Sequence, residues 1–321
     1  MPVERNLILV HTRGDQDVRD FQDIGRRVVA LAPDIEVFIA ENDLPCSVTR
    51  RRAGRRPTLI FSPGNLIYFR PLRGKVYAGS PIPKLEQLAR FKAAGLPVAE
   101  SLEITPDVVL SEEKFGAYVV VKPGYSQAAA PAGQDAVLTR REAVCFRPRD
   151  SYPAGHPGRM GPMYAQRFVD TGPYVNYHRV LTIFGEPLIA FKTTSLTARP
   201  PLDAPDDDLA KIPVKATRTS GPVKRELFRD ADILELARRT YLALPEIPLQ
   251  AVDMVKDAQS GQLFVLEANP GGNTWIFSKT SGRGGPAMYR AALGMEDLTA
   301  QFDAFATAAR TLVERTRAEA Q

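Results

Sequence analysis

The stretch that decides the fold is 249–273, which reads LQAVDMVKDAQSGQLFVLEANPGGN. Two apolar runs flank the segment 257–261, DAQSG, which is rich in turn-forming residues. Because apolar runs on both sides of such a segment are typical of paired strands, the stretch predicts a β-hairpin. Three polar residues interrupt runs that otherwise suit a buried sheet: Asp253, Glu267 and Asn269.

These three polar side chains are expected on one face of the hairpin. Glu267 and Asn269 are two residues apart, and side chains at that spacing on a strand point to the same side. A hairpin centred near Gln259 would place Asp253 opposite Val265 and diagonal to Glu267. A register slip by an even number of residues would keep Asp253 on that face, whereas an odd slip would remove it.

Two carboxylates and one amide on an apolar face form a candidate metal site. Unpaired charges in such a place are costly, and a divalent cation would stabilise them. Oxygen-only ligands favour Mg²⁺ or Mn²⁺ over zinc, and Mg²⁺ commonly completes its shell with water and substrate phosphates. Taken singly, each residue fits better on a half-exposed hairpin that faces water. Together, and followed at once by the turn residues 270–272, they favour one or two ions held by Asp253, Glu267 and Asn269.

A strand with an aspartate, a turn and then VLEANP is similar to the metal-binding end of the ATP-grasp superfamily. Carboxylate–amine and carboxylate–thiol ligases of the glutathione synthetase and ribosomal-protein glutamate ligase type read similarly there. The resemblance extends from Ser80 to Asn273, most of the chain, with its short motifs in the expected order. It implies an α+β ATP-grasp fold, in which two α+β subdomains clasp ATP, behind a Rossmann-like α/β domain.

The composition is that of a soluble globular protein of roughly two domains. The 321 residues are 44% hydrophobic and 25% charged, and 42 Lys and Arg against 37 Asp and Glu leave a net charge of +5. This mild excess suits an anionic ligand such as a nucleotide and requires no nucleic acid. The arginines of 50–56 are its main concentration. They favour a solvated loop over a contact with phosphate or an acidic substrate.

Cysteine usage and hydropathy favour a cytoplasmic location. Cys46 and Cys145 are far apart and form no CxxC pair, so neither a disulfide framework nor a zinc site is expected. The N-terminal apolar run, Leu7–Val10, is too short for a signal peptide, and no stretch has the apolar length of a membrane span. The sequence leaves the oligomeric state open.

Residues 1–82 are predicted to form the Rossmann-like domain. Apolar runs read as strands at 7–10, 35–40, 58–61 and 76–78. Helical spacing of apolar residues over 18–31 predicts a helix between the first two strands, and this order favours a small, mostly parallel sheet. The segment His11–Asp15, HTRGD, follows the first strand in place of a GxGxxG motif, so no dinucleotide site is expected there.

Two lysines are expected to contact nucleotide phosphates. Lys84 lies in the first turn of a helix predicted to end near Gly95, where the helix dipole disfavours a cation, so a nearby anion would explain it better than helix stability does. Lys122 follows the β-rich run 117–121 and is well placed as a point charge in a cleft. Both segments resemble the ATP-grasp elements that carry the two ATP lysines, and Lys122 is also a catalytic candidate. The glycine-rich loop of many members is reduced here to Gly124.

The segment 163–169, MYAQRFV, resembles the strand between lid and core, where main-chain groups bind the adenine edge. An ordinary half-buried strand fits the same letters equally well. The resemblance assigns nucleotide contacts to Gln166, Arg167, Phe168 and Val169. Arg167 stands where many members have glutamate, an exchange that main-chain recognition tolerates. Asp170 and Asn176 are the nearest matches to the family's acidic ribose ligand.

A second hairpin is predicted over 179–191, with its turn at Gly185 and Glu186. It resembles the core hairpin of the family. Arg179 and Lys192 are its candidates to face phosphates or a carboxylate, and the resemblance makes Arg179 the residue that would orient the acceptor carboxylate.

The last third of the chain is expected to contain one loose segment and two helices. The proline-rich segment 199–222 predicts a mobile surface loop. Apolar spacing predicts helices over 230–243 and 302–313, the second packing on the core. Glycines after Asn269 could bring backbone amides to a ligand, although flexible turns explain them equally well.

These elements predict three parts: residues 1–82, an ATP-grasp domain over 83–295 and a C-terminal helix region over 296–321. The lid would occupy about 110–165 and the core about 166–295.

The resemblance implies an ATP- and Mg²⁺-dependent ligase. Such an enzyme phosphorylates a small-molecule or peptide carboxylate and then transfers the acyl group to an amine, or less often a thiol. Two alternatives stay open: a kinase that phosphorylates a hydroxyl, and a nucleotide-binding module without catalysis. Neither nucleic acid nor a membrane is an expected partner.

Overall fold

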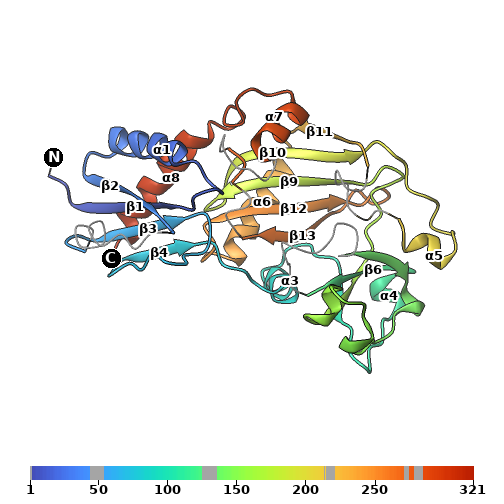
Figure 1. Cartoon of the computed structure of the whole chain (residues 1–321). Helices are drawn as coiled ribbons and strands as arrows, with labels where there is room; N and C mark the ends of the chain where they lie inside the picture. The colour runs from blue at the N-terminus through green and yellow to red at the C-terminus, as the bar shows by residue number, and fades with distance from the viewer. Residues whose placement is uncertain are drawn as a thin grey trace.

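The computed structural model describes residues 2–43, 54–124, 136–212, 214, 221–270, 275–277 and 285–321. These residues form three β-sheets with helices packed against them. Figure 1 shows the N-terminal sheet at the left, a five-stranded sheet in the centre and a third sheet below it at the right. Among the described residues, no helix has the length and apolar character needed to cross a membrane.

The N-terminal sheet is parallel, with the strand order β2-β1-β3-β4. Its elements are β1 (Arg5–His11), α1 (Val18–Leu31), β2 (Ile35–Glu41), β3 (Thr58–Ser62) and β4 (Lys75–Ala78). The predicted strands, helix and parallel arrangement are confirmed, while the assignment to the Rossmann type stays a prediction. In Figure 1 the arrowheads of these strands point toward the central sheet, so any ligand at their carboxyl edge would face it.

The five-stranded sheet is antiparallel, with the strand order β11-β10-β9-β12-β13. Its strands are β9 (Asn176–Ile183), β10 (Glu186–Ser195), β11 (Val223–Leu227), β12 (Leu249–Lys256) and β13 (Leu263–Asn269). The predicted hairpin of β9 and β10 turns at Phe184 and Gly185, whose φ angles are 49° and 86°. Positive φ at both central positions is typical of the type I′ turn, which matches the twist of the flanking strands.

The register of the β12–β13 hairpin differs from the predicted one. Asp253 lies opposite Glu267, and Val265 lies opposite Met254, which leaves Leu266 as an extra residue in a β-bulge. Near the turn the strands are displaced by one residue from the predicted pairing, an odd slip that alone would turn Asp253 to the other face. The bulge adds one more residue. The total displacement is therefore even, and Asp253 stays on the face of Glu267.

Two helices, α3 (Lys84–Ala93) and α6 (Ala231–Ala243), cover one face of the five-stranded sheet. Their apolar residues share a cluster with Val180, Val252 and Met254, whose side chains alternate with those of the candidate site. The predicted inward residues of α6 are all buried: Ile233, Leu236, Ala237 and Tyr241. The polar site residues therefore occupy the opposite face of the sheet.

The third sheet has the strand order β5-β8-β6-β7, and most of it lies within the range 110–165 predicted for the lid. Its strands are β5 (Ser101–Glu103), β6 (Tyr118–Pro123), β7 (Val137–Arg140) and β8 (Met163–Arg167). Short helices lie beside it: α4 (Glu112–Phe115), η1 (Arg141–Ala143), η2 (Arg149–Ser151) and η3 (Pro157–Arg159). The predicted connecting strand, β8, is a central strand here, paired with β5 and β6. The proposed domain boundaries stay a prediction.

Part of the segment 199–222 is packed against the third sheet. It contains α5 (Asp206–Leu209), and Leu209 and Ile212 are buried in a cluster with Leu138 of β7. The prediction of a mobile surface loop was therefore wrong for this part. Two apolar residues three apart are too short a pattern to identify a helix. Residues 213 and 215–220 lie outside the described ranges.

The C-terminal helix α8 (Ala304–Glu319) ties two sheets together. Its Leu312 shares one core with Leu9 of β1 and Leu188 of β10, so it packs on the N-terminal sheet as well as on the predicted core. After the helix, Gln321 exchanges two backbone hydrogen bonds of 2.9 and 3.2 Å with Thr58. The preceding helix, α7 (Gly285–Leu293), lies beside β11 (Figure 1).

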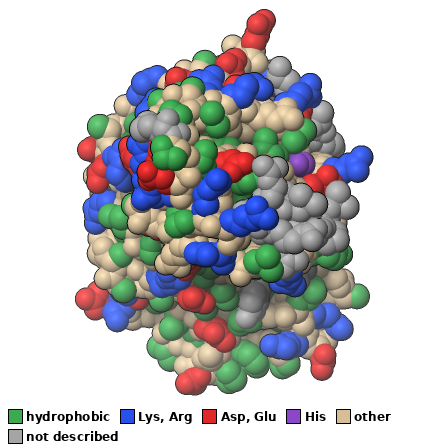
Figure 2. Space-filling view, turned by 90° about the vertical axis from the view of Figure 1, so that its left-hand side faces the viewer, with side chains coloured by type: hydrophobic (Ala, Val, Ile, Leu, Met, Phe, Trp, Pro, Cys, Tyr) green, Lys and Arg blue, Asp and Glu red, His purple; other side chains and the backbone are tan. Residues whose placement is uncertain are grey.

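The predicted basic loop is described only in part. Residues 50–53 lie outside the described ranges, and Arg56 pairs with Glu36 at 2.6 Å. Figure 2 looks onto this end of the molecule, where Lys and Arg side chains gather near the middle of the face with Asp and Glu around them. For Arg56, the solvated-loop interpretation thus gives way to an ion pair.

Candidate active site on the five-stranded sheet

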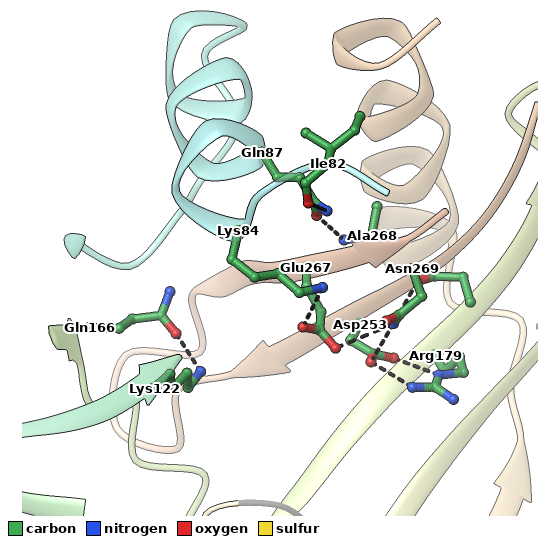
Figure 3. Close-up of polar contacts among 11 residues, drawn as sticks. Ile82, Lys84, Gln87, Lys122, Gln166, Arg179, Asp253, Glu267, Ala268 and Asn269 are labelled. Carbon is green, nitrogen blue, oxygen red and sulfur yellow. Dashed lines mark hydrogen bonds and ion pairs between the residues drawn. The ribbon is translucent and has the colours of Figure 1, made fainter. Parts of the chain in front are cut away.

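Asp253, Glu267 and Asn269 share one face of the sheet and contact one another (Figure 3). The Nδ2 of Asn269 lies 3.2 Å from Asp253 Oδ2 and 3.3 Å from Glu267 Oε1. Asp253 is buried and Glu267 is half-buried. The predicted common face is observed, and the role of these residues as metal ligands stays a prediction.

Arg179 of β9 neutralises Asp253. It lies directly opposite Asp253 in the register, and its Nε and Nη2 each donate a hydrogen bond of 2.6 Å to one carboxylate oxygen. A guanidinium fork that meets both oxygens of a carboxylate is a strong ion-pair geometry. Burial disfavours the charged guanidinium, but the attraction of Asp253 outweighs it and holds the pKa of Arg179 well above its ordinary value.

Lys84 reaches the site from the first turn of α3. Its Nζ lies 2.9 Å from Glu267 Oε2, and only 6% of the residue is exposed. Glu267 is therefore an anion of the kind that this cation was expected to need. Two hydrogen bonds hold the helix in place: the Lys84 amide donates to the carbonyl of Gly124 at 2.9 Å, and Gln87 Oε1 accepts from the amide of Ala268 at 3.2 Å.

Lys122 enters from the end of β6. Its Nζ donates to Gln166 Oε1 at 2.6 Å, and Gln166 in turn donates through Nε2 to Ser101 Oγ at 3.1 Å. Gln166 is almost fully buried, so this chain fixes the lysine side chain. Because the Lys84 amide bonds to the residue two positions after Lys122, the two lysines come from adjoining elements (Figure 3).

Two of the three main-chain amides at the end of β8 already donate hydrogen bonds to the protein. The amide of Arg167 donates to the carbonyl of Glu100 at 2.8 Å, and that of Phe168 donates to Tyr118 at 3.1 Å. Within the described ranges, the amide of Val169 makes no main-chain hydrogen bond. The Arg167 side chain is exposed. Of the three consecutive residues, Val169 is therefore the one whose amide is best suited to an adenine edge.

The two candidate ribose ligands, Asp170 and Asn176, form hydrogen bonds within the loop before β9. Asn176 Nδ2 donates to the carbonyls of Thr171 and Tyr174, at 3.0 Å each. Asp170 accepts a hydrogen bond from a main-chain amide two residues on, and its other oxygen pairs with Arg199 at 2.8 Å. The polar atoms of both residues therefore hold this loop in place, and their ribose role stays a prediction.

The register places Lys192 on the face opposite the site, so its expected placement beside Arg179 was wrong. Lys192 lies opposite His178, whereas Phe191 lies opposite Arg179. Paired residues of antiparallel strands share a face and successive residues alternate, so Lys192 faces away from the site. A β-bulge at Leu188 is the cause. Without that extra residue, a turn at the predicted position would put Lys192 on the face of Arg179.

His178, beside Lys192, is expected to make stability depend on pH. Burial, reinforced by Lys192, lowers the pKa of His178 from 6.5 to about 4. Between these values the unfolded chain binds a proton that the folded chain does not. The stabilisation is therefore complete above pH 6.5, falls as the pH falls and is absent below about pH 4, for a total of roughly 3 kcal/mol.

We expect His178→Leu to flatten this dependence. Urea denaturation at pH 7, 5.5 and 4.5 measures it. The control variant is Leu242→Ala, an exposed site on α6 without a titratable group. A slope for His178→Leu equal to that of the unmodified chain would contradict the assignment.

The donor set suits a hard cation. Asp253 and Glu267 offer carboxylate oxygens, and a half-turn of the Asn269 amide would replace Nδ2 with an oxygen toward the same space. Among the described residues no group of three or more His, Cys, Asp or Glu gathers, and Mg²⁺ typically takes only one or two carboxylates. Lys84 and Arg179 already neutralise both carboxylates, so phosphates that accompany the ion would balance its charge.

Several residues near the site escaped the sequence analysis. Tyr164 of β8 is buried close to Glu267, and burial followed by the charge of Glu267 raises its pKa. Arg225 of β11 lies on the site face. The alternation of side chains along the short strand 223–227 was the one sequence signal for this placement. The glycines at 271, 272, 282 and 284 lie outside the described residues.

The fold is that of known ligases. The chain is similar to the ATP-grasp ligase PsnB in complex with a phosphomimetic variant of its minimal precursor, Mg and ADP, with 14% identity, 95% of this chain and 99% of that chain covered, and a TM-score of 0.51. It is also similar to D-cycloserine synthetase DcsG, with 14% identity, 97% and 99% covered, and a TM-score of 0.50. The sequence matches no family model and no curated protein. The chain therefore has the ATP-grasp fold.

Proposed function

We propose that this protein is an ATP- and Mg²⁺-dependent ligase that joins a carboxylate to an amine, or to a thiol, through an acyl phosphate. One observation carries the proposal: Asp253 and Glu267 lie side by side on one sheet face, each paired with a cation, Arg179 or Lys84. In such an arrangement a metal ion can replace the Lys84 ammonium at Glu267, and Lys84 can then pair with a phosphate, while Arg179 stays paired with Asp253. The ADP and Mg bound to PsnB, a chain of the same fold, agree with it.

The nucleotide would lie between the third sheet and the five-stranded sheet. Lys84 and Lys122 would contact its phosphates, and the main chain at Val169 its adenine edge. Asp253, Glu267 and Asn269 would hold one or two Mg²⁺ or Mn²⁺ ions, which supply positive charge to the transferring phosphoryl group. Since Lys84 pairs with Glu267 at 2.9 Å, it would move to the phosphates when the nucleotide binds.

Arg179 would orient the substrate carboxylate. It uses Nε and one N–H of Nη2 on Asp253, which leaves both N–H groups of Nη1 and the second of Nη2 as donors to a ligand. A carboxylate oxygen bonds to the γ-phosphorus as the bond from that phosphorus to ADP breaks. The amine nitrogen then bonds to the acyl carbon, the C–O bond electrons leave with phosphate, and phosphate or water takes the nitrogen's proton. The protein contributes position and fixed charge.

An ADP-release screen over amino acids and small carboxylates, with Mg²⁺ present, tests the proposal. We expect release that requires both a carboxylate and an amine acceptor, with an amide identified by mass spectrometry. A stable phosphorylated alcohol would instead identify a kinase. Nucleotide binding without ADP release across the whole screen would identify a binding module, and either result would overturn the ligase assignment.

A further inference from the structure

A second arginine lies on the sheet face that carries the candidate site. Arg225 of β11 is opposite Thr193 of β10, and Thr193 is opposite Tyr177 of β9. Tyr177 precedes Arg179 by two residues on the same strand, and side chains at that spacing share a face. Arg225 and Thr193 therefore look onto the same side of the sheet as Arg179 and its partner Asp253.

One polar atom on this part of the face has no partner. The Nε of Arg225 is enclosed without a hydrogen bond in the described part of the chain. The hydroxyl of Thr193, which is fully buried, lies within hydrogen-bonding reach of the Tyr177 hydroxyl. Folded proteins leave few buried polar groups unsatisfied, because each costs about 1–3 kcal/mol. A half-buried guanidinium with an enclosed, unpaired Nε, next to a buried hydroxyl, indicates a group built to receive a ligand.

Helix α7 packs over the site face of β10 and β11 through Tyr289. The ring of Tyr289 packs on Phe191 with centroids 5.4 Å apart, and the Cζ of Arg225 lies 5.1 Å from the centre of the same ring. In Figure 1, α7 lies at the β10 and β11 side of the sheet, whereas α3 and the third sheet lie at the β13 side. Arg225 and Thr193 thus lie on the side of the site away from Lys84 and Lys122.

We propose that Arg225 and Thr193 form a subsite for a second carboxylate of the substrate, remote from the carboxylate that is activated. This inference rests on the proposed function. A guanidinium fork and a hydroxyl are donors that suit a carboxylate. Strand spacing places the Cα atoms of Arg225 and Arg179 roughly 12 Å apart. The substrate class is therefore a dicarboxylic acid or an acidic peptide, rather than a simple monocarboxylate.

The test measures binding of linear α,ω-dicarboxylates, from succinate to suberate, to the full chain by calorimetry. The monocarboxylates of the same chain length serve as matched probes. We expect at least one dicarboxylate to bind about 10- to 100-fold more tightly than its monocarboxylate, and Arg225→Gln to remove that difference. Lys224→Gln is the control, because Lys224 is the exposed neighbour on the other face of the same strand.

Thr193→Val keeps the inference testable if Arg225→Gln fails to fold. The change is nearly isosteric and removes one hydroxyl, whose partner among the described residues is Tyr177, so the folded structure should be kept. Affinity for the preferred dicarboxylate should fall about 3- to 10-fold. A less stable Thr193→Val variant with unchanged dicarboxylate binding would show a structural role and overturn the subsite.

The two proposals fail in different ways. If carboxylates drive ADP release but dicarboxylates and monocarboxylates bind equally, the ligase stands and the subsite is wrong. If dicarboxylates bind preferentially through Arg225 but no carboxylate drives ADP release, the subsite stands and the ligase is wrong.

Discussion

Replacing Glu267 with alanine should reduce Mg²⁺-dependent ADP release to below about 1% of that of the unmodified chain. Glu267 is the best placed of the three predicted ligands to bridge two ions, since it lies opposite Asp253, near Asn269 and 2.9 Å from Lys84. Without it, the positive charge that should neutralise the γ-phosphate loses its anchor. The measurement is steady-state ADP release with saturating Mg²⁺.

The fold should survive this change. Circular dichroism and urea denaturation check that point, and Glu267→Gln provides a second variant that keeps the shape of the side chain. Glu246→Ala is the matched control, because Glu246 forms an exposed ion pair with Arg90 at 2.6 Å, away from the site. Unchanged ADP release in a folded Glu267→Ala protein would refute the metal site.

Arg179→Leu is expected to lower the free energy of unfolding by about 3–5 kcal/mol. The change removes two hydrogen bonds of 2.6 Å and leaves the carboxylate of Asp253, which is 7% exposed, without its cation. An uncompensated buried charge costs far more than the net contribution of the pair. Urea denaturation at pH 7 without divalent ions measures the effect.

A second change should restore the stability that Arg179→Leu removes. In the double variant Arg179→Leu/Asp253→Leu, no charge is left behind, so most of the lost stability should return while ADP release stays absent. Arg238→Leu is the control, since its ion pair with Glu235 is exposed and should contribute less than about 1 kcal/mol. Equal losses for Arg179→Leu and Arg238→Leu would contradict the buried pair.

The secondary structure was largely predictable because its signals are local. The spacing of Ile233, Leu236, Ala237 and Tyr241 indicated α6, and all four side chains are buried in one helical face. Turn residues between apolar runs located both hairpins. In contrast, α5 has only Leu209 and Ile212 to mark it, and their burial depends on contact with a strand some seventy residues earlier in the chain.

The two bulges explain why the expected common face of Asp253 and Glu267 is observed and the expected placement of Lys192 is not. At Leu266 the bulge compensated an odd register, so Asp253 joined Glu267. At Leu188 the bulge turned Lys192 toward His178. A strand presents side chains with a period of two, so a single inserted residue reverses a face. Periodicity in one strand contains no information on where its partner has an extra residue.

The sequence by itself determined which elements form and which residue types are available, because propensity, alternation and turn chemistry act over a few neighbours. It also pointed to the ATP-grasp fold through the order of its short motifs. Tertiary structure alone decided which charges meet, namely Arg179 with Asp253 and Lys84 with Glu267. It also left the Nε of Arg225 without a partner among the described residues. Those encounters depend on strand register and on contacts between residues more than fifty positions apart, which no local pattern specifies.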